Sequence, residues 1–143
     1  MIILSGFETG GERLQTALDS GDQEDEHSCF SDNTHRDMIQ DIQGVLNVWN
    51  GRYVRLDQSV VEGTGISDVV RAINPELADA LDVQIATSLA AANALVPPFD
   101  TEIAAGNTEG RARVQALITA LRDQEQLLQD VFRLFNLSIP EPE

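Results

Sequence analysis

Both histidines of this chain fall within one acidic stretch, residues 22–37, which has the sequence DQEDEHSCFSDNTHRD and is called the acidic segment below. Carboxylate oxygens and imidazole nitrogens are the ligands that suit zinc, iron and manganese. Two carboxylate-x-x-imidazole spacings occur in the segment, Glu24 with His27 and Asp32 with His35. On a helix, side chains three positions apart share a face, and di-iron helical bundles use that arrangement. The spacing therefore predicts part of a metal or ligand site, with His27 and His35 as candidate metal ligands.

The pair Asp32 and His35 is the better placed of the two, because it falls in the first turn of a predicted helix and the other pair precedes that helix. His35 would also share a helix face with Met38 and Ile42. A histidine in that position can equally be a hydrogen-bonded residue at the boundary of the core, and this alternative stays open.

Short hydrogen-bonding side chains are dense in the same segment, namely Ser28, Ser31, Asn33 and Thr34. Helix capping and loop closure need only some of them. The surplus favours a polar pocket or an internal polar network. A purely structural role, in which these side chains only hold helix ends, is the alternative.

Cys29 is the one cysteine, so the chain cannot form an internal disulfide. Its position near His27 would suit a nucleophile and a base, but its neighbour Phe30 is more typical of a buried, inert cysteine. The sequence contains no HExxH, EF-hand loop, P-loop, GxGxxG or GxSxG motif. No catalytic residue is therefore assigned.

The formal charge of the chain is −15, from 24 acidic and 9 basic residues. This balance repels nucleic-acid phosphates and anionic lipids and favours cations or basic partners, although solvation alone also explains it. No apolar run approaches the roughly 20 residues that a membrane span needs. Neither nucleic acid nor a transmembrane segment is expected. The N-terminal sequence MIILSGFETGG also lacks the basic start and long apolar core of a signal peptide.

Apolar residues at helical spacing predict helices along the whole chain. The first helix is expected to end at Ser20 and Gly21, and the second to start near Ser31 and Asp32 and to end near Gly51. Their apolar stripes are Leu4, Phe7, Gly11, Leu14 and Leu18 in the first helix, and Met38, Ile42, Val45, Leu46, Trp49 and Tyr53 in the second.

A polar loop is predicted from Val54 to Gly65, and a short helix follows from Ser67. Asn74 and Pro75 form a strong helix start, because an N-cap side chain precedes a proline at the first helical position. That helix is expected to run toward the stop at residues 97–98.

The stretch FDTEIAAG at residues 99–106 predicts one short helical piece, and Thr108 is expected to cap the last helix. The tail at residues 138–143 is predicted to be disordered. Together these elements predict an all-α fold, a four-helix-bundle-like single domain over residues 1–137 with short extra helices in the connections. The stripe of the last helix is Val114, Leu117, Ile118, Leu121, Leu128, Val131 and Phe135.

Four stretches of the chain resemble the C-terminal half of imelysin-like proteins: GERLQTALDSGDQEDEHSCFSDNTHRD, GVLNVWNGRY, ISDVV and GRARVQALITAL. The resemblance covers about Leu4 to Leu137, and the acidic segment looks like a characteristic block of the iron-regulated protein A branch. It implies an all-helical fold of two bundle-like halves, a periplasmic or outer-membrane-attached location in bacteria, and a link to iron uptake. Some imelysin-like proteins are described as metallopeptidases.

The resemblance also implies a site between the two halves. That site combines a GxHxxE motif from the N-terminal half with polar residues from the C-terminal half. The matching positions in this chain are Glu24, Glu26, His27, Ser28, Ser31, Asp32 and His35.

The chain departs from this pattern because it contains no HxxE, since Phe30 follows His27 and Met38 follows His35 at the third position. The half that carries the GxHxxE motif and a leader are both expected to be missing, so the chain would be a half-length relative or a fragment. We therefore predict a non-enzymatic binding module, with iron or zinc as the candidate metal, rather than a metallopeptidase-like enzyme. A half that normally packs on another half leaves a face uncovered, which predicts a homodimer or a partner that supplies the missing half.

Overall fold

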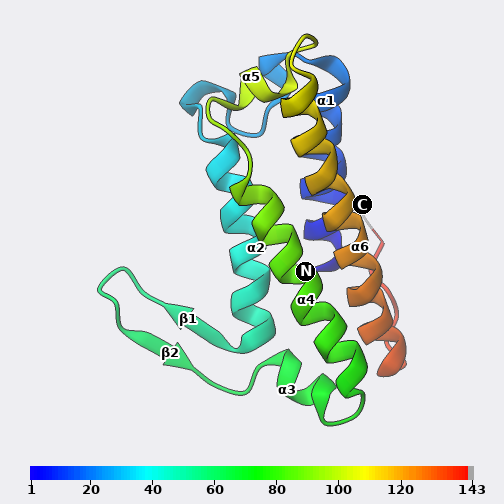
Figure 1. The fold of residues 1–143 in the computed structure, drawn as a ribbon. Coiled ribbons are helices and arrows are strands. Elements are labelled where there is room, and N and C mark those ends of the chain that lie inside the picture. The colour runs from blue at the N-terminus through cyan, green and yellow to red at the C-terminus, as the bar shows by residue number, and fades with distance from the viewer. Residues whose placement is uncertain (142–143) are drawn as a thin grey trace.

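Four runs of apolar residues form four long helices, which pack as a bundle in the computed structural model, where residues 1–141 are described (Figure 1). The last of these helices packs against the first and the third, and the second packs against both of these as well. The all-helical fold class predicted from the sequence is confirmed. The long helices are η1 (Ile3–Gln15) continued by α1 (Thr16–Ser20), then α2 (Thr34–Asn50), α4 (Pro75–Asn93) and α6 (Thr108–Leu134).

Short elements fill the connections between these helices. They are η2 (Gln23–Asp25), η3 (Cys29–Ser31), β1 (Arg52–Val54), β2 (Val60–Glu62), α3 (Ile66–Arg71) and α5 (Phe99–Ile103).

Aliphatic side chains fill most of the core, and Trp49 and Phe99 are the largest side chains that are fully buried. The Trp49 indole Nε1 donates to Asp82 Oδ1 at 2.6 Å, which ties α2 to α4. Within residues 1–141, no helix combines the length and the apolar character needed to cross a membrane.

The first helix differs from the predicted amphipathic helix, because η1 is a π-helix, in which N–H groups bond to the carbonyl five residues earlier. The wider turn changes which side chains face inward, so Leu4 and Phe7 of the predicted stripe are only half-buried. A Cβ at Gly6 would lie 1.8 Å from Glu125 Oε2, so glycine permits the close approach of α6. The side chains and glycines of η1 that are buried are Ser5, Gly6, Thr9, Gly10 and Leu14.

Two predicted helix caps are wrong by one or more residues. Ser31 lies in η3 and Asp32 has a left-handed φ of 50°, so α2 begins only at Thr34. At α6 the cap is Asn107, whose Oδ1 accepts from the Gly110 N–H at 2.9 Å, because Thr108 already lies inside the first turn.

The other helix ends follow the sequence closely. Asn74 Oδ1 accepts from the Leu77 N–H at 3.1 Å and caps α4, with Pro75 as its first residue. Gly21 and Gly51 end the first and second helices in the left-handed conformation, with φ values of 65° and 62°.

The predicted loop from Val54 to Gly65 is wrong in part, because β1 and β2 pair as an antiparallel hairpin. Tyr53 pairs with Val61 and Val54 with Val60, and all six strand residues are exposed. Apolar residues on both faces hide the period-two alternation that identifies a half-buried strand. The turn also lacks an Asn-Gly pair, since Gln58 takes the left-handed position with a φ of 67°.

The predicted disordered tail lies partly outside the described residues, which end at 141. Residues 138–141 form no helix or strand. Its disorder stays a prediction.

Candidate functional site

The acidic segment connects α1 to α2 at one end of the bundle, beside α5 (Figure 1). Two short 3₁₀ turns, η2 and η3, shape it. Asp22 Oδ1 accepts from the Glu24 N–H at 3.0 Å and so starts the first turn. The segment is therefore mostly a connection, and only its last four residues belong to α2.

Glu26 is the one side chain of the segment that is both acidic and buried, with 6% of its surface exposed. Its Oε1 has no hydrogen-bond partner among the described residues. Burial raises the pKa of the Glu26 carboxyl, and the nearby carboxyls of Asp100 and Asp32 raise it further, while a hydrogen bond with the Thr34 hydroxyl opposes the rise. The Glu26 carboxyl is therefore under the influence of negative charge from two distant parts of the chain, Asp32 in the same segment and Asp100 in α5.

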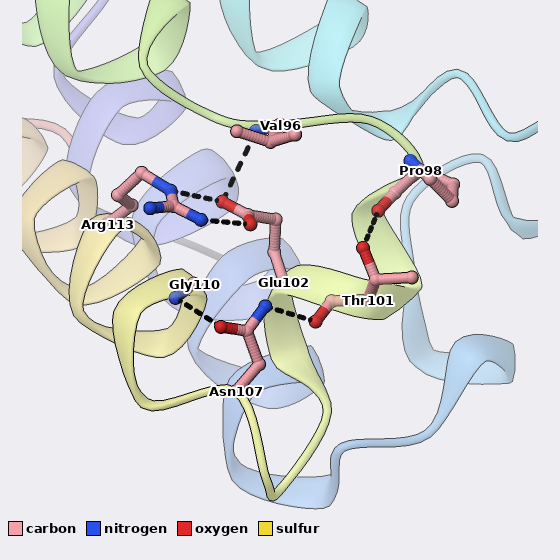
Figure 2. A network of polar contacts seen from close by, with 7 residues as sticks. All are labelled: Val96, Pro98, Thr101, Glu102, Asn107, Gly110 and Arg113. Carbon is pink, nitrogen blue, oxygen red and sulfur yellow. Dashed lines mark hydrogen bonds and ion pairs between the residues drawn. The ribbon is translucent and has the colours of Figure 1, made fainter.

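Asp100 comes from α5, and its Oδ1 is likewise buried without a hydrogen-bond partner in residues 1–141. The position of α5 is fixed by the next acidic residue, Glu102, which is 1% exposed. Figure 2 shows the Arg113 guanidinium bonding both Glu102 oxygens, with Nε to Oε2 at 2.7 Å and Nη2 to Oε1 at 2.6 Å. The Val96 N–H also donates to Glu102 Oε2 at 3.2 Å, so one carboxylate joins α5, its preceding loop and α6.

The same network closes around the start of α6. Asn107 Nδ2 donates to the Thr101 carbonyl at 2.8 Å while its Oδ1 caps α6, and the Thr101 hydroxyl donates to the Pro98 carbonyl at 2.8 Å (Figure 2). The hydrogen bonds from Arg113 lower the pKa of Glu102. This charged anchor holds α5, which carries Asp100, against α6.

A second polar cluster lies where the segment meets η1 and α2. The Ser28 hydroxyl donates to Asp37, and the Thr9 hydroxyl donates to Asp41 Oδ2 at 3.1 Å. Burial raises the pKa of Asp41, an effect that the Thr9 hydrogen bond and the nearby His27 and Arg13 oppose.

Thr34 links the two clusters. It is almost fully buried at the start of α2. Its Oγ1 accepts from the Ser28 N–H at 3.1 Å, and the Thr34 hydroxyl also lies close enough to the Glu26 carboxyl to oppose the rise in its pKa. Two of the short polar side chains predicted to build an internal network, Ser28 and Thr34, therefore take part in such a network.

The predicted site residues separate into three groups. Glu26 is buried, with the charge of the exposed Asp32 raising its pKa, and Ser28 donates its N–H to the neighbouring Thr34. His27 lies on the Asp41 side, and His35 is half-buried with an Nδ1 that has no partner among the described residues. Glu24 and Ser31 are exposed.

No group of three or more His, Cys, Asp or Glu side chains in residues 1–141 is placed to hold a metal ion. The predicted pairing of Asp32 with His35 on one helix face does not arise, because Asp32 precedes the helix in a left-handed conformation. The described residues therefore do not fit a complete iron or zinc site.

Sequence reasoning missed Asp41, Thr9 and Asp100. Asp41 follows Asp37 by one helical turn, so the helix spacing could have identified it. No local signal connects Thr9 or Asp100 to the acidic segment, since both come from other elements of the bundle.

One comparison with known proteins supports the imelysin-like family. The family model described as Imelysin matches residues 4–128, which is most of the chain. No curated protein matches it.

Proposed function

Because this chain belongs to the imelysin family, we propose that it is a non-enzymatic binding module of bacterial iron uptake whose acidic segment forms part of a ligand site. Its location would be the cell envelope, as the family suggests, and its branch the iron-regulated protein A group. The acidic segment resembles a characteristic block of that branch, and the chain lacks the HxxE and HExxH motifs of a metallopeptidase.

One observation carries the proposal: Glu26 Oε1 and Asp100 Oδ1 are both buried without a hydrogen-bond partner among the described residues, and the Asp100 carboxyl raises the pKa of Glu26. A buried acceptor without a donor costs about 1–3 kcal/mol, and more when it is charged. A ligand that supplies donors or positive charge would remove this cost. The exposed Asp32, close to Glu26, is on the side from which we expect a ligand to approach.

The ligand that suits this arrangement is a cationic group. The acidic segment carries six carboxylates and one arginine in a chain of formal charge −15, which attracts cations over long range. A metal ion bound here would need further donors from outside this chain, because the described residues do not provide three. The remaining predicted residues, Glu24, Ser28, Ser31, His27 and His35, would be peripheral contacts.

Calorimetric titration of the purified chain tests the proposal. The three probes are Zn²⁺, Fe²⁺ under anaerobic conditions, and agmatine. Agmatine carries an ammonium group at one end and a guanidinium group at the other. We expect at least one probe to bind, and Glu26→Gln and Asp100→Asn to weaken that binding at least about tenfold, as the loss of a hydrogen bond to a charged group does. At acid pH, where the Glu26 carboxyl is protonated, binding of a cation should also release protons, detected by titrating in two buffers of different ionisation heat.

Glu76→Gln is the matched control, since Glu76 is exposed in the first turn of α4 and lies outside the acidic segment. Its affinity should equal that of the unmodified chain. If no probe binds, or if Glu26→Gln binds as tightly as the control, the acidic segment has only a structural role. Binding that survives His27→Ala and His35→Ala would remove the imidazoles from the site.

The proposal extends to a partner. The exposed apolar side chains outside the bundle core suggest a surface that a second copy or the other half of an imelysin-like protein would cover.

A further inference from the structure

Exposed apolar side chains concentrate on the hairpin and on the part of α2 beside it. Leu56 at the tip is 99% exposed. Figure 1 shows the hairpin projecting away from the bundle, so neither of its faces is covered. The other members of this set, which we call the hairpin surface, are Val48, Tyr53, Val54, Val60 and Val61.

A groove of about 430 Å³ runs between the hairpin and α2. Tyr53 and Val61, which are paired across the two strands, form one wall, and Val48 with Asn47 forms the other. Gly44 lies at the edge of the helix wall. A two-stranded hairpin is marginal in water by itself, because it buries little apolar surface. Its exposed apolar faces and unpaired outer edges are features of a surface that pairs or packs with another chain.

Gly44 is unusual, because glycine is a poor residue for the middle of a helix. It is exposed in α2, and a Cβ added there would meet no atom within 4 Å. Nothing in residues 1–141 therefore requires a glycine at this position. A glycine on an exposed helix face allows the backbone of another molecule to approach closely.

Charge favours a second copy as that molecule. Residues 42–51 carry no charged side chain, and the hairpin with its flanks, residues 51–65, carries two arginines and two acidic residues. The formal charge of −15 therefore lies entirely on the rest of the chain. Two copies repel each other through most of their surfaces, so a neutral face is where they can meet at the lowest electrostatic cost.

We propose that the hairpin surface and the Gly44 groove form the interface of a two-fold symmetric dimer. The hairpin of each copy lies against the groove of the other, which makes the contact self-complementary. Arg52 and Glu62, whose Nε–Oε1 distance is 2.7 Å, would lie at its polar rim. This interface is independent of the proposed ligand site, which lies at the opposite end of α2.

Sedimentation velocity over a concentration series tests the dimer, with Gly44→Gln as the main variant. The expected result is that the unmodified chain dimerises and that Gly44→Gln weakens the dimer at least about tenfold, because the new side chain would stand where the partner's backbone approaches. The variant should also unfold at a higher temperature, because glutamine is the better helix former. Loss of the dimer would then not result from loss of the fold.

Gly106→Gln is the matched control, since a Cβ at Gly106 also meets no atom within 4 Å and lies away from the hairpin surface. A second pair compares Leu56→Asp with Val83→Asp, which places the same charge on an exposed position of α4. Only Leu56→Asp should weaken the dimer. A monomer at concentrations up to roughly a millimolar would overturn the proposal. So would a dimer that neither Gly44→Gln nor Leu56→Asp weakens. Cation binding by Gly44→Gln reports separately on the ligand site.

Discussion

Two glutamates, both almost fully buried, show how neighbours decide the effect of a carboxyl group. Glu102 receives two hydrogen bonds from Arg113 and one from the Val96 N–H, and its pKa is lowered. Glu26 has the Thr34 hydroxyl and two nearby carboxyls, and its pKa is raised. The first glutamate should therefore stabilise the fold when it is charged, and the second should destabilise it.

Glu26→Gln is expected to raise the unfolding temperature at neutral pH. The folded chain keeps the Glu26 proton to a higher pH than the unfolded chain does. The folded chain therefore loses stability as the pH rises from the pKa of the unfolded chain through the raised pKa of the folded chain. Glutamine removes this penalty, and the gain should disappear as the pH falls below the ordinary glutamate pKa. Circular dichroism melts from about pH 4 to pH 8 measure it. Glu24→Gln, at an exposed position of the same segment, should show no such gain, and a lower unfolding temperature for Glu26→Gln at neutral pH would contradict the expectation.

Glu102→Gln should have the opposite sign. A lowered folded pKa contributes stability that is present above the unfolded pKa and is lost as the pH falls through the folded value. We expect a loss of about 1.5–3 kcal/mol at neutral pH, the range for hydrogen bonds to charged groups. Urea unfolding at a series of pH values measures the loss, which should shrink toward acid pH. An equal loss at every pH would show that packing, not charge, is responsible.

At the scale of elements, the π-helical η1 determines which polar side chains face the core, and the hairpin determines where apolar side chains are exposed. The π-helical turns of η1 direct Ser5 and Thr9 inward, where Gln124 Nε2 donates to Ser5 Oγ at 2.8 Å and Thr9 reaches Asp41. The hairpin leaves α2 at Gly51 and returns close to it at Gly63, whose N–H donates to the Gly51 carbonyl at 2.9 Å. Both elements depend on residues with small side chains where two backbones approach.

Gly51→Ala is expected to destabilise the connection between α2 and the hairpin. Gly51 has a φ of 62°, and a Cβ there would lie 2.5 Å from the Gly63 carbonyl oxygen. The left-handed conformation alone costs an alanine about 1–2 kcal/mol, and the contact adds to it. Chemical denaturation should show this loss, whereas Gly63→Ala, where a Cβ meets no atom within 4 Å, should be nearly neutral. Equal effects of the two substitutions would refute this account of the turn.

At the scale of the whole molecule, the net charge opposes the compact fold. Like charges repel more in the folded chain than in the expanded one. The ion pairs in the described residues are mostly exposed, and such pairs contribute little. Salt should therefore act mainly through the repulsion among the acidic residues.

Raising the salt concentration from about 10 mM to about 150 mM should raise the unfolding temperature, because the screening length falls from about 30 Å to about 8 Å. Differential scanning calorimetry at both concentrations measures the shift. The double variant Glu76→Gln, Asp123→Asn removes two exposed acidic side chains, and its shift should be smaller. An unfolding temperature that falls with salt would mean that attractive ion pairs outweigh the repulsion.

The sequence by itself determined the four long helices and several of their ends. Apolar spacing acts within a helix, and the stops at Gly21 and Gly51 and the start at Asn74 and Pro75 depend on neighbouring residues alone. The same local logic located the acidic segment. It failed at the hairpin, whose apolar faces are both exposed, so no alternation marks it.

Only the tertiary structure decided what the acidic segment contains. Asp100 influences the Glu26 carboxyl because Glu102 and Arg113 fix α5 against α6, and Thr9 reaches Asp41 because η1 packs beside α2. The tertiary structure also placed His27 near Asp41, and no three ligand-type side chains of residues 1–141 come together to hold a metal ion. Residue spacing determines which side chains share a face of one element, whereas the packing of distant elements determines which faces meet.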